Sequence, residues 1–205
     1  MPAVAQANDT AMNEKRFPAS EAHRLDNPAR IEWLAPSEVL GALNLHAGQT
    51  VADVGAGTGY LSLPLAQFVG PKGKVYAVDA QDDMLSLLQQ KIDWSHLSNV
   101  ILIHAEAHQT GLPASCCGLF FMANVWHEIE DKSAVLGEAM QVLEPGGRIA
   151  ILDWRPDVKP EHGPPLADRV DVSHAMGSLR SAGFEQVVSA EVGRYSWLVQ
   201  GGKPQ

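Results

Sequence analysis

A glycine-rich segment after an apolar run near residue 50 is the part of the sequence best suited to bind a ligand. Within residues 51–60, Asp53 and the glycines Gly55, Gly57 and Gly59 form the pattern Asp-x-Gly-x-Gly-x-Gly. Glycines let the backbone turn tightly and approach a ligand closely, and the start of a following helix leaves backbone N–H donors free. The segment therefore predicts a ligand site where a buried strand turns into a helix.

The spacing of these glycines excludes two common nucleotide-binding motifs. A Gly-x-Gly-x-x-Gly dinucleotide fingerprint requires a third glycine at position 60 or 62, where the sequence has Tyr60 and Ser62. No Gly-Lys-Ser or Gly-Lys-Thr follows the turn, so a Walker A loop is absent as well. An NAD-dependent oxidoreductase stays open as an alternative on fold class alone, although it lacks the required glycine spacing.

A second carboxylate, Asp79, ends the next predicted strand, downstream of Gly59. In a doubly wound sheet a carboxylate at this position lies where it can accept from both hydroxyls of a nucleotide ribose. Hydrogen bonds to a charged group contribute about 1.5 to 3 kcal/mol each, so one such residue changes affinity more than tenfold. The alternative is a solvated carboxylate at the strand end, or the N-cap of the next helix.

A third group of candidate residues follows the fourth predicted strand. His127 has the side chain whose ordinary pKa best suits a general base near neutral pH, and Glu128 or Asp153 would orient it. A His-Glu pair after a strand also serves as a helix cap or a structural hydrogen bond, and this alternative stays open. Trp126 and Trp154 are expected in a pocket wall or the core rather than in a cage for a cation.

The elements that must position these residues follow from the hydrophobic pattern. Short β-rich runs alternate with segments of helical period, which predicts a mainly parallel sheet with helices on both faces. Only Gly193 and Arg194 separate the last two runs, which allows an antiparallel hairpin but no parallel crossover. The predicted strands are residues 50–54, 74–78, 100–103, 118–123, 148–153, 186–192 and 195–200.

The helical segments and the ends of the chain complete this organisation. One helix starts at Ser37, which resembles an N-cap, and further helices are predicted at 60–68, 83–94, 132–143 and about 173–182. Glu144 opens a Pro-Gly-Gly turn between the fourth of these and the next strand. Residues 1–15 are predicted to be a flexible tail, and 16–205 a single domain with an N-terminal cap (16–45) and a core (46–205).

Composition and charge exclude several function classes. The 205 residues include 15 Lys and Arg and 24 Asp and Glu, which gives a formal net charge of −9. The basic residues are dispersed along the sequence, which argues against nucleic acid binding. No apolar run approaches the roughly 18 residues of a membrane helix, and the N-terminus has no secretory signal. We therefore expect no membrane insertion and a cytoplasmic location. The adjacent Cys116 and Cys117 exclude a disulfide framework, and no metal is required.

The ordered set of these features resembles the class I S-adenosylmethionine-dependent methyltransferases. The set comprises a glycine turn after strand one, acids after strands two and three, aromatic and polar residues after strand four, and a terminal hairpin. The resemblance covers about residues 40–200 and implies a Rossmann-like, doubly wound, seven-stranded α/β fold. It is nearest to small bacterial and archaeal members with a short N-terminal helical cap containing a His-Arg-Leu such as His23-Arg24-Leu25. These are similar to ubiquinone and menaquinone C-methyltransferases and to arsenite methyltransferases.

By position, the resemblance implies a set of contacts with S-adenosylmethionine. The glycine turn faces the methionine portion of the cofactor, and Asp53 orients its amino end. Asp79 holds the ribose, with Ala80 beside the adenine. Glu106 stands where the family usually has Asp, and the longer side chain contacts the adenine edge. The implied cofactor residues are Asp53, Gly55, Ala56, Gly57, Thr58, Gly59, Asp79, Ala80, Glu106, Ala107 and, beside the sulfonium and the substrate, Asn124.

The resemblance implies methyl transfer to a small-molecule acceptor by in-line displacement, with His127 and Glu128 as catalytic candidates. A signature for amino methylation is absent after strand four, and Cys116 and Cys117 do not match the distributed cysteines of arsenite methyltransferases. A non-catalytic protein that binds the cofactor and acts through a partner is a further alternative. Apolar residues of the cap form either a lid over the pocket or the surface of a homodimer.

Overall fold

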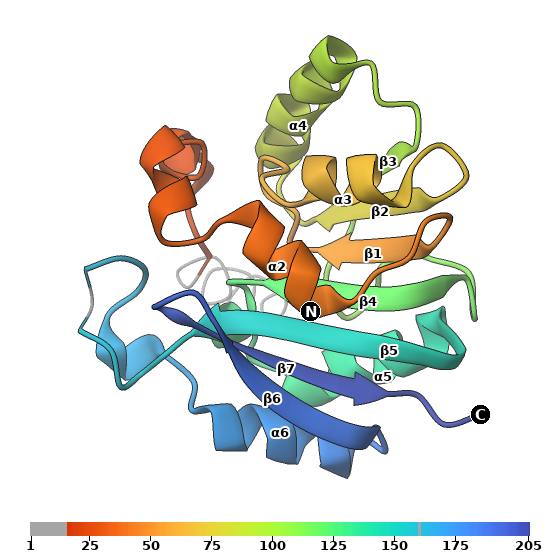
Figure 1. Ribbon diagram of the computed structural model, residues 1–205, viewed down its shortest axis with the longest axis vertical. Coiled ribbons are helices and arrows are strands. Elements are labelled where there is room, and N and C mark those ends of the chain that lie inside the picture. The colour runs from red at the N-terminus through yellow and green to blue at the C-terminus, as the bar shows by residue number, and fades with distance from the viewer. Residues whose placement is uncertain (1–15, 160) are drawn as a thin grey trace, which may run out of the picture.

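A twisted sheet of seven strands runs through the centre of the molecule (Figure 1). The computed structural model describes residues 16–159 and 161–205, so the tail predicted at 1–15 lies outside the described residues. The strand order is β3-β2-β1-β4-β5-β7-β6, which confirms the predicted fold class. The strands are β1 (Thr50–Val54), β2 (Lys74–Asp79), β3 (Val100–His104), β4 (Cys117–Ala123), β5 (Leu143–Trp154), β6 (Glu185–Val192) and β7 (Ser196–Gly202).

The direction of the strands brings the polar candidates to one edge of the sheet. β1 to β5 pair in parallel, and β7 lies antiparallel between β5 and β6, as the predicted hairpin requires. The chain order reverses between β1 and β4, and ligands bind at the carboxyl ends of strands beside such a reversal. The residues that follow β1, β2 and β4 therefore share one end of the sheet.

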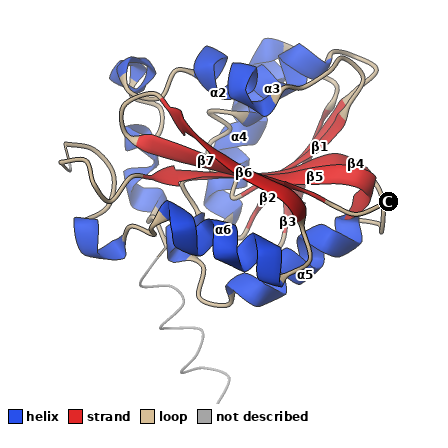
Figure 2. Cartoon of the chain, turned by 60° about the horizontal axis from the view of Figure 1, so that its bottom comes forward, coloured by secondary structure: helices blue, strands red, loops and turns tan. Residues whose placement is uncertain are grey.

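Helices cover both faces of the sheet (Figure 2). Val51 and Phe121 pack on one face, while their neighbours Ala52 and Phe120 pack on the other. The central strands are thus apolar on both faces, as a mainly parallel sheet between two helical layers requires. One face carries α2 (Pro36–Leu43), α3 (Ser62–Val69) and α4 (Asp82–Ser95), and the opposite face carries α5 (Lys132–Val142) and α6 (Val172–Ser181).

The predicted cap of α2 at Ser37 is wrong. The helix begins at Pro36, and its N-cap is Ala35, which supplies no side-chain hydrogen bond. Proline is favoured at the first helical position because its missing N–H would have no intrahelical acceptor there and its fixed φ suits the helix. Ser37 therefore lies inside the helix.

Three further boundaries differ from the prediction. The glycine turn extends to Leu61, so α3 begins at Ser62 instead of residue 60. Residues 193–195 separate β6 from β7, so the hairpin loop has three residues rather than two. Strand β5 begins directly after α5 and contains a register shift, so the predicted turn at Glu144 lies within the strand.

Two short 3₁₀ helices, η1 (Ala19–Arg24) and η2 (Pro28–Glu32), form the cap together with α2. The cap is attached to the core by buried Leu34, whose carbonyl accepts from the Tyr60 hydroxyl at 2.6 Å. The residues of η1 and η2 lie at the carboxyl end of the sheet, where the site residues gather (Figure 1). Among the described helices none is long and apolar enough to cross a membrane.

Candidate active site

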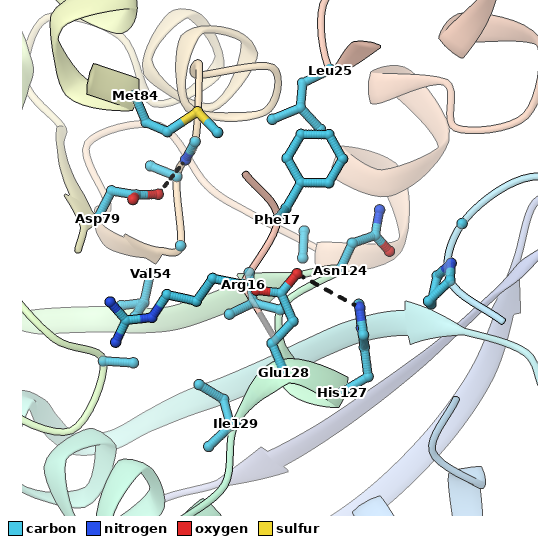
Figure 3. Close-up of a pocket in the computed structure, with 18 of the residues that line it drawn as sticks. Arg16, Phe17, Leu25, Val54, Asp79, Met84, Asn124, His127, Glu128 and Ile129 are labelled. Carbon is cyan, nitrogen blue, oxygen red and sulfur yellow. Dashed lines mark hydrogen bonds and ion pairs between the residues drawn. The ribbon is translucent and has the colours of Figure 1, made fainter. Parts of the chain in front are cut away.

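A large cavity lies at the carboxyl ends of β1, β2 and β4, between the cap and the loop after β5. Its volume is about 1430 Å³. Apart from Gly59, each residue predicted for the site lines it: Asp53, Gly55, Ala56, Gly57, Thr58, Asp79, Ala80, Glu106, Ala107, Asn124, His127 and Glu128. Figure 3 shows several of these side chains converging on one space. The structure therefore brings together residues that the sequence separates by up to three strands.

The glycine turn after β1 adopts backbone conformations that other residues rarely take. Gly55, Gly57 and Gly59 have φ values of 77°, 54° and 82°. A Cβ on Gly59 would lie 2.1 Å from Cδ1 of Leu88, so this glycine lets the turn pack against α4. Gly57 instead directs its N–H to the Asp79 carboxylate, at 2.7 Å. The predicted cofactor contact of Gly59 stays a prediction, and its packing role is what the structure describes.

Asp79 is held by backbone donors on both of its carboxylate oxygens. Oδ2 accepts from Gly57, and Oδ1 accepts from the N–H of Gln81 at 2.9 Å. Burial raises the pKa of Asp79 above its ordinary value, and these two hydrogen bonds and Arg16 act in the opposite direction. A carboxylate accepts about four hydrogen bonds, so acceptor positions remain for a ligand hydroxyl. The two backbone hydrogen bonds therefore fix the orientation of the Asp79 carboxylate before a ligand binds.

Asp53 is a nearly completely buried carboxyl group at the end of β1. Its exposed fraction is 3%, and Oδ2 accepts from the Ser62 hydroxyl at 2.5 Å. Burial raises the pKa of Asp53 to about 6, the hydrogen bond from Ser62 opposes this shift, and the charge of Asp79 adds to it. A positively charged group in the cavity would stabilise the ionised form, because it would offset the cost of burying the charge.

Asn124 supplies buried polar groups without partners at the end of β4. Its φ is 58°, in the left-handed region that asparagine tolerates better than most residues, and its N–H donates to Leu152 at 2.8 Å. Among the described residues neither its side-chain nitrogen nor its oxygen has a hydrogen-bond partner. Leaving a buried polar group unpaired costs about 1–3 kcal/mol. The amide is therefore suited to bind a polar group of a ligand in the cavity.

His127 lies in the short helix η3 (Trp126–Glu128) between two carboxyl groups. Its Nδ1 lies 2.8 Å from Oδ1 of Asp153, and its Nε2 lies 3.7 Å from Oε1 of Glu128. Asp153 is buried and also accepts from the backbone N–H groups of His127 and Trp154, both at 2.8 Å. The sequence left open which acid orients the ring, and the short contact with Nδ1 identifies Asp153. Glu128 lies on the side of Nε2.

These contacts shift the pKa values of His127 and Glu128. Burial alone would lower the pKa of His127, but the hydrogen bond and charge of Asp153, together with Glu128, raise it above 6.5. Burial raises the pKa of Glu128 to about 7, with His127 opposing the shift. Glu128 therefore exchanges a proton near neutral pH, and His127 holds its proton more tightly than a free imidazole does.

The family follows from comparison with known proteins. A family model described as a methyltransferase domain matches residues 45–188, which contain the glycine turn, both acidic strand ends and His127. The chain belongs to this methyltransferase domain family. A SAM-dependent methyltransferase from Aquifex aeolicus superposes with a TM-score of 0.86 and 33% identity, covering 92% of this chain and 100% of that protein. The predicted class I methyltransferase family is confirmed.

Two further matches show how far the similarity to known methyltransferases extends. A demethylmenaquinone methyltransferase from Geobacillus stearothermophilus is 34% identical over 116 residues, 57% of this chain and 50% of the relative. The chain thus spans about half the length of the curated relatives it matches. Phosphoethanolamine N-methyltransferase 2 of Haemonchus contortus, in complex with S-adenosyl-L-methionine, has a TM-score of 0.70 at 12% identity, covering 83% of this chain and 52% of its own. At that identity the likeness shows only the fold.

Residues 16–18, which we call the strap, also line the cavity of this methyltransferase domain (Figure 3). The sequence did not predict this role for them. The carbonyl of Phe17 accepts from Nε2 of Gln81 at 3.0 Å, and its N–H donates to the Glu128 carboxylate. These contacts join the N-terminal side of the domain to the ends of β2 and β4. No sequence motif indicates these contacts, because the residues that form them lie far apart in the chain.

The strap also engages a predicted cofactor residue. Arg16 donates from Nη2 to both carboxylate oxygens of Glu106, at 2.8 and 2.7 Å. The pair is partly exposed, with 25% of the Arg16 side chain and 40% of the Glu106 side chain accessible. The expected contact between Glu106 and an adenine edge stays a prediction, and Arg16 is the partner that the structure adds.

Hydrogen bonds and an ion pair join the cap to the glycine turn. The Thr58 hydroxyl donates to Oδ1 of Asp26 at 2.7 Å, and Nζ of Lys91 contacts the same oxygen at 2.5 Å. Lys91 also donates to the Thr58 carbonyl at 2.8 Å. The Thr58 side chain, predicted to contact the cofactor, thus fixes the cap above the turn.

Aromatic rings from the cap and from the loop after β5 form one wall of the cavity. Trp33 stacks on His162 at 4.8 Å with an interplanar angle of 13°, and lies 5.2 Å from Trp154. Arg169 holds the loop by donating to the carbonyls of Pro164 and His162, among others. Trp154 lines the cavity, as expected of a pocket wall, whereas Trp126 is fully buried in the core.

The two cysteines take no part in this site. Cys116 and Cys117 are free thiols, with their Sγ atoms 3.4 Å apart, at the start of β4 and therefore at the opposite end of the strand. Within the described part of the chain, no three His, Cys, Asp or Glu side chains are arranged to hold a metal ion.

Proposed function

We propose that this protein transfers a methyl group from S-adenosylmethionine to a small-molecule acceptor. The observation that carries the proposal is the unpartnered, buried amide of Asn124, which faces the same cavity as the glycine turn and the carboxyl groups of Asp53 and Asp79. A nucleoside joined to a charged amino acid requires donors and acceptors of these kinds. The family match and the Aquifex relative support the same cofactor.

The residues present fit S-adenosylmethionine, and they divide the cavity into two halves. In the cofactor half, Asp79 accepts from the ribose hydroxyls, Asp53 accepts from the ammonium group, and the glycine turn lies against the methionine portion. Ala80, Glu106 and the backbone of Ala107 surround the adenine. When bound, the cofactor would supply a methyl group activated by its positively charged sulfur, and Asn124 would lie beside the sulfonium and the acceptor without separating them.

The acceptor half contains the groups that can move a proton. With Asp153 fixing Nδ1, the Nε2 atom of His127 is the position that takes a proton from the acceptor, and the charge of Glu128, 3.7 Å from Nε2, stabilises the protonated ring. The aromatic wall and the strap exclude water from this half, which aligns the reacting atoms and favours displacement at carbon.

The acceptor that fits this half best is a small, planar, largely apolar molecule with an ionisable position. Trp33 and Trp154 provide flat apolar surfaces in the cavity wall, while His127 provides the base. The relatives named demethylmenaquinone methyltransferases are consistent with an acceptor of this class. A cytoplasmic location and a homodimer remain predictions. The described cap residues Phe17 and Leu25 line the cavity, which favours the lid over the dimer surface.

Calorimetric titration of the full chain with S-adenosylmethionine, S-adenosylhomocysteine and NADH tests the proposal. We expect micromolar binding of both adenosyl ligands and none of NADH. Asp79→Ala should weaken their binding at least tenfold, because it removes hydrogen bonds to a charged acceptor. Asp83→Ala is the matched control, since that exposed carboxylate lies in the first turn of α4 and does not line the cavity.

The other outcomes each select a different function. Binding of NADH alone would establish the oxidoreductase alternative and overturn the proposal. Binding of S-adenosylmethionine without methyl transfer to any of a panel of planar phenols and quinols would favour the non-catalytic protein that acts through a partner. Unchanged affinity in Asp79→Ala would refute the assignment of the ribose to that residue.

A further inference from the structure

Arg30 is a buried cation in the cavity wall that takes no part in the proposed proton transfer. It lies in η2, is only 7% exposed, and lines the cavity with the glycine turn. Its Nη1 donates to the Leu25 carbonyl at 2.9 Å, but its buried Nε has no hydrogen-bond partner. Among the described residues no carboxylate forms an ion pair with it.

Aromatic rings, rather than acids, hold this guanidinium in place. Its central carbon lies 4.1 Å from the centroid of the Tyr60 ring and 5.6 Å from that of Trp33. Burial lowers the pKa of Arg30 to about 10, with Tyr60 and Asp26 opposing the shift, so the side chain is charged at neutral pH. A buried charge without a counterion is costly, and a negatively charged ligand would remove that cost.

The position of Arg30 limits which ligand group it can meet. Tyr60, on whose ring it rests, is the residue directly after Gly59, so the cation lies over the end of the glycine turn. Asp53 precedes the same turn and lines the same cavity. An amino acid end of a ligand at this turn therefore finds an anion for its ammonium group in Asp53, which precedes the turn, and a cation for its carboxylate in Arg30, which packs on the residue that follows it.

We infer that Arg30 binds the α-carboxylate in the methionine portion of S-adenosylmethionine. The inference rests on the proposed function and adds a binding residue from the cap to those at the strand ends. Arg30 has an unpaired N–H at Nε beside its Nη groups, and this planar arrangement matches the two oxygens of a carboxylate. The cap thus takes part in holding the cofactor as well as covering the cavity.

The test compares two ligands that differ only in the carboxylate. S-adenosylhomocysteine and its decarboxylated analogue are titrated into the wild-type protein and into Arg30→Gln. We expect the wild type to prefer the carboxylate ligand at least tenfold, because each charge-assisted hydrogen bond of this kind is worth that factor or more. Arg30→Gln should lose this preference, and its affinity for the decarboxylated analogue should stay within twofold of wild type.

Two controls keep the result independent of damage to the cap. Arg180→Gln changes an exposed arginine of α6 that does not line the cavity, and it should keep the tenfold preference. Arg30→Lys keeps the charge without the planar fork and should retain part of the preference, about threefold. The comparison of the two ligands on the wild type needs no substitution at all.

Each contrary result has a distinct meaning. Equal weakening of both ligands in Arg30→Gln would show that Arg30 only holds the cap and would overturn the inference. The same conclusion would follow if the wild type bound both ligands equally well. An unchanged preference in Arg30→Gln with a raised KM for the acceptor would assign Arg30 to the acceptor instead. Failure of both S-adenosylhomocysteine and its decarboxylated analogue to bind the wild type would refute the proposed function itself.

Discussion

The cofactor half and the acceptor half of the cavity are built on different principles. In the cofactor half, strand ends and backbone N–H groups set the geometry, as where Gly57 and Gln81 hold Asp79. In the acceptor half, side chains from separate segments set it, as where Asp153 orients His127 and Trp33 stacks on His162. A site held by backbone is fixed by the fold, whereas one held by side chains changes with single substitutions.

Because backbone groups shape one half and side chains the other, the two halves suit different kinds of ligand. The carboxyl group of Asp79 keeps its orientation in any chain that keeps the sheet and the turn, so the cofactor half suits a constant ligand. The ring of His127 depends on Asp153 and Glu128, so the acceptor half suits ligands that differ between family members. Substitutions in one half should therefore leave the other half intact, and this separation is testable.

The largest expected effect comes from His127→Ala in the acceptor half. Loss of a positioned base costs 10² to 10⁴ in rate, so we expect kcat to fall about a thousandfold. Affinity for S-adenosylhomocysteine should stay within twofold, because the cofactor half is untouched. Asp153 keeps its backbone donors in the variant, which limits structural damage. Full activity would show that His127 is structural, and a parallel loss of cofactor affinity would contradict the separation of the halves.

The pH profile of the wild type sharpens the same prediction. The pKa values of His127 and Glu128 are raised above their ordinary values, that of Glu128 to about 7. A base must lose its proton before it can act, so kcat should rise with pH through the region near and above 7. In Glu128→Gln the profile should shift because one of the two coupled groups is gone. A flat profile between pH 6 and pH 9 would argue against proton transfer by this pair.

The second prediction concerns the stability of the cofactor half. The folded pKa of Asp53, about 6, lies above the ordinary value of 3.8. The protonated form is thus favoured on folding, and its stabilising contribution is lost as the pH rises through 6. At pH 8 the ionised group costs about 3 kcal/mol of folding free energy, and at pH 5 about half of that.

Replacing the carboxyl group by an amide removes this cost, because Asn can still accept from Ser62. Asp53→Asn should raise the free energy of unfolding in urea at pH 8 by about 3 kcal/mol without ligand, and by less at pH 5. It should also weaken S-adenosylmethionine binding, since the ammonium group loses its anion. An equal stability change at both pH values would contradict the raised pKa.

The smallest expected effect comes from the strap, which touches both halves. The ion pair between Arg16 and Glu106 is partly exposed, and such pairs contribute about 0–1 kcal/mol. Arg16→Ala should therefore weaken S-adenosylhomocysteine binding no more than about fivefold, mainly through faster dissociation in stopped-flow measurements. Arg180→Ala, which changes an exposed arginine of α6 outside the cavity, is the matched control. Tighter binding in Arg16→Ala would instead show that the strap competes with the cofactor.

Sequence alone predicts which residues gather in the proposed cofactor half of the cavity, because the determinants of their position are local. The turn, Asp53 and Asp79 belong to consecutive strand ends, and parallel strands bring such ends together without any further information. The acceptor half is less predictable. His127 could be singled out by its chemistry, but the choice of Asp153 over Glu128 as the acid that orients it depends on side-chain distances.

The cap is the part that the sequence reveals least. Arg30 is one arginine among others in a segment without clear period, and only its burial over Tyr60 distinguishes it from exposed Arg24. The contacts of Arg16 join positions 90 residues apart, and no local pattern encodes them. Gly59 shows the reverse case, because its place in the motif suggests a ligand contact while Leu88 explains why it must be glycine.

The stack of Trp33 on His162 also constrains the order in which the chain folds. Trp33 precedes the first strand, whereas His162 follows the fifth, so their contact closes a very long loop and forms only when most of the sheet exists. The glycine turn, by contrast, needs only neighbouring elements. The aromatic wall should consequently be among the last parts of the native structure to form and among the first to open locally.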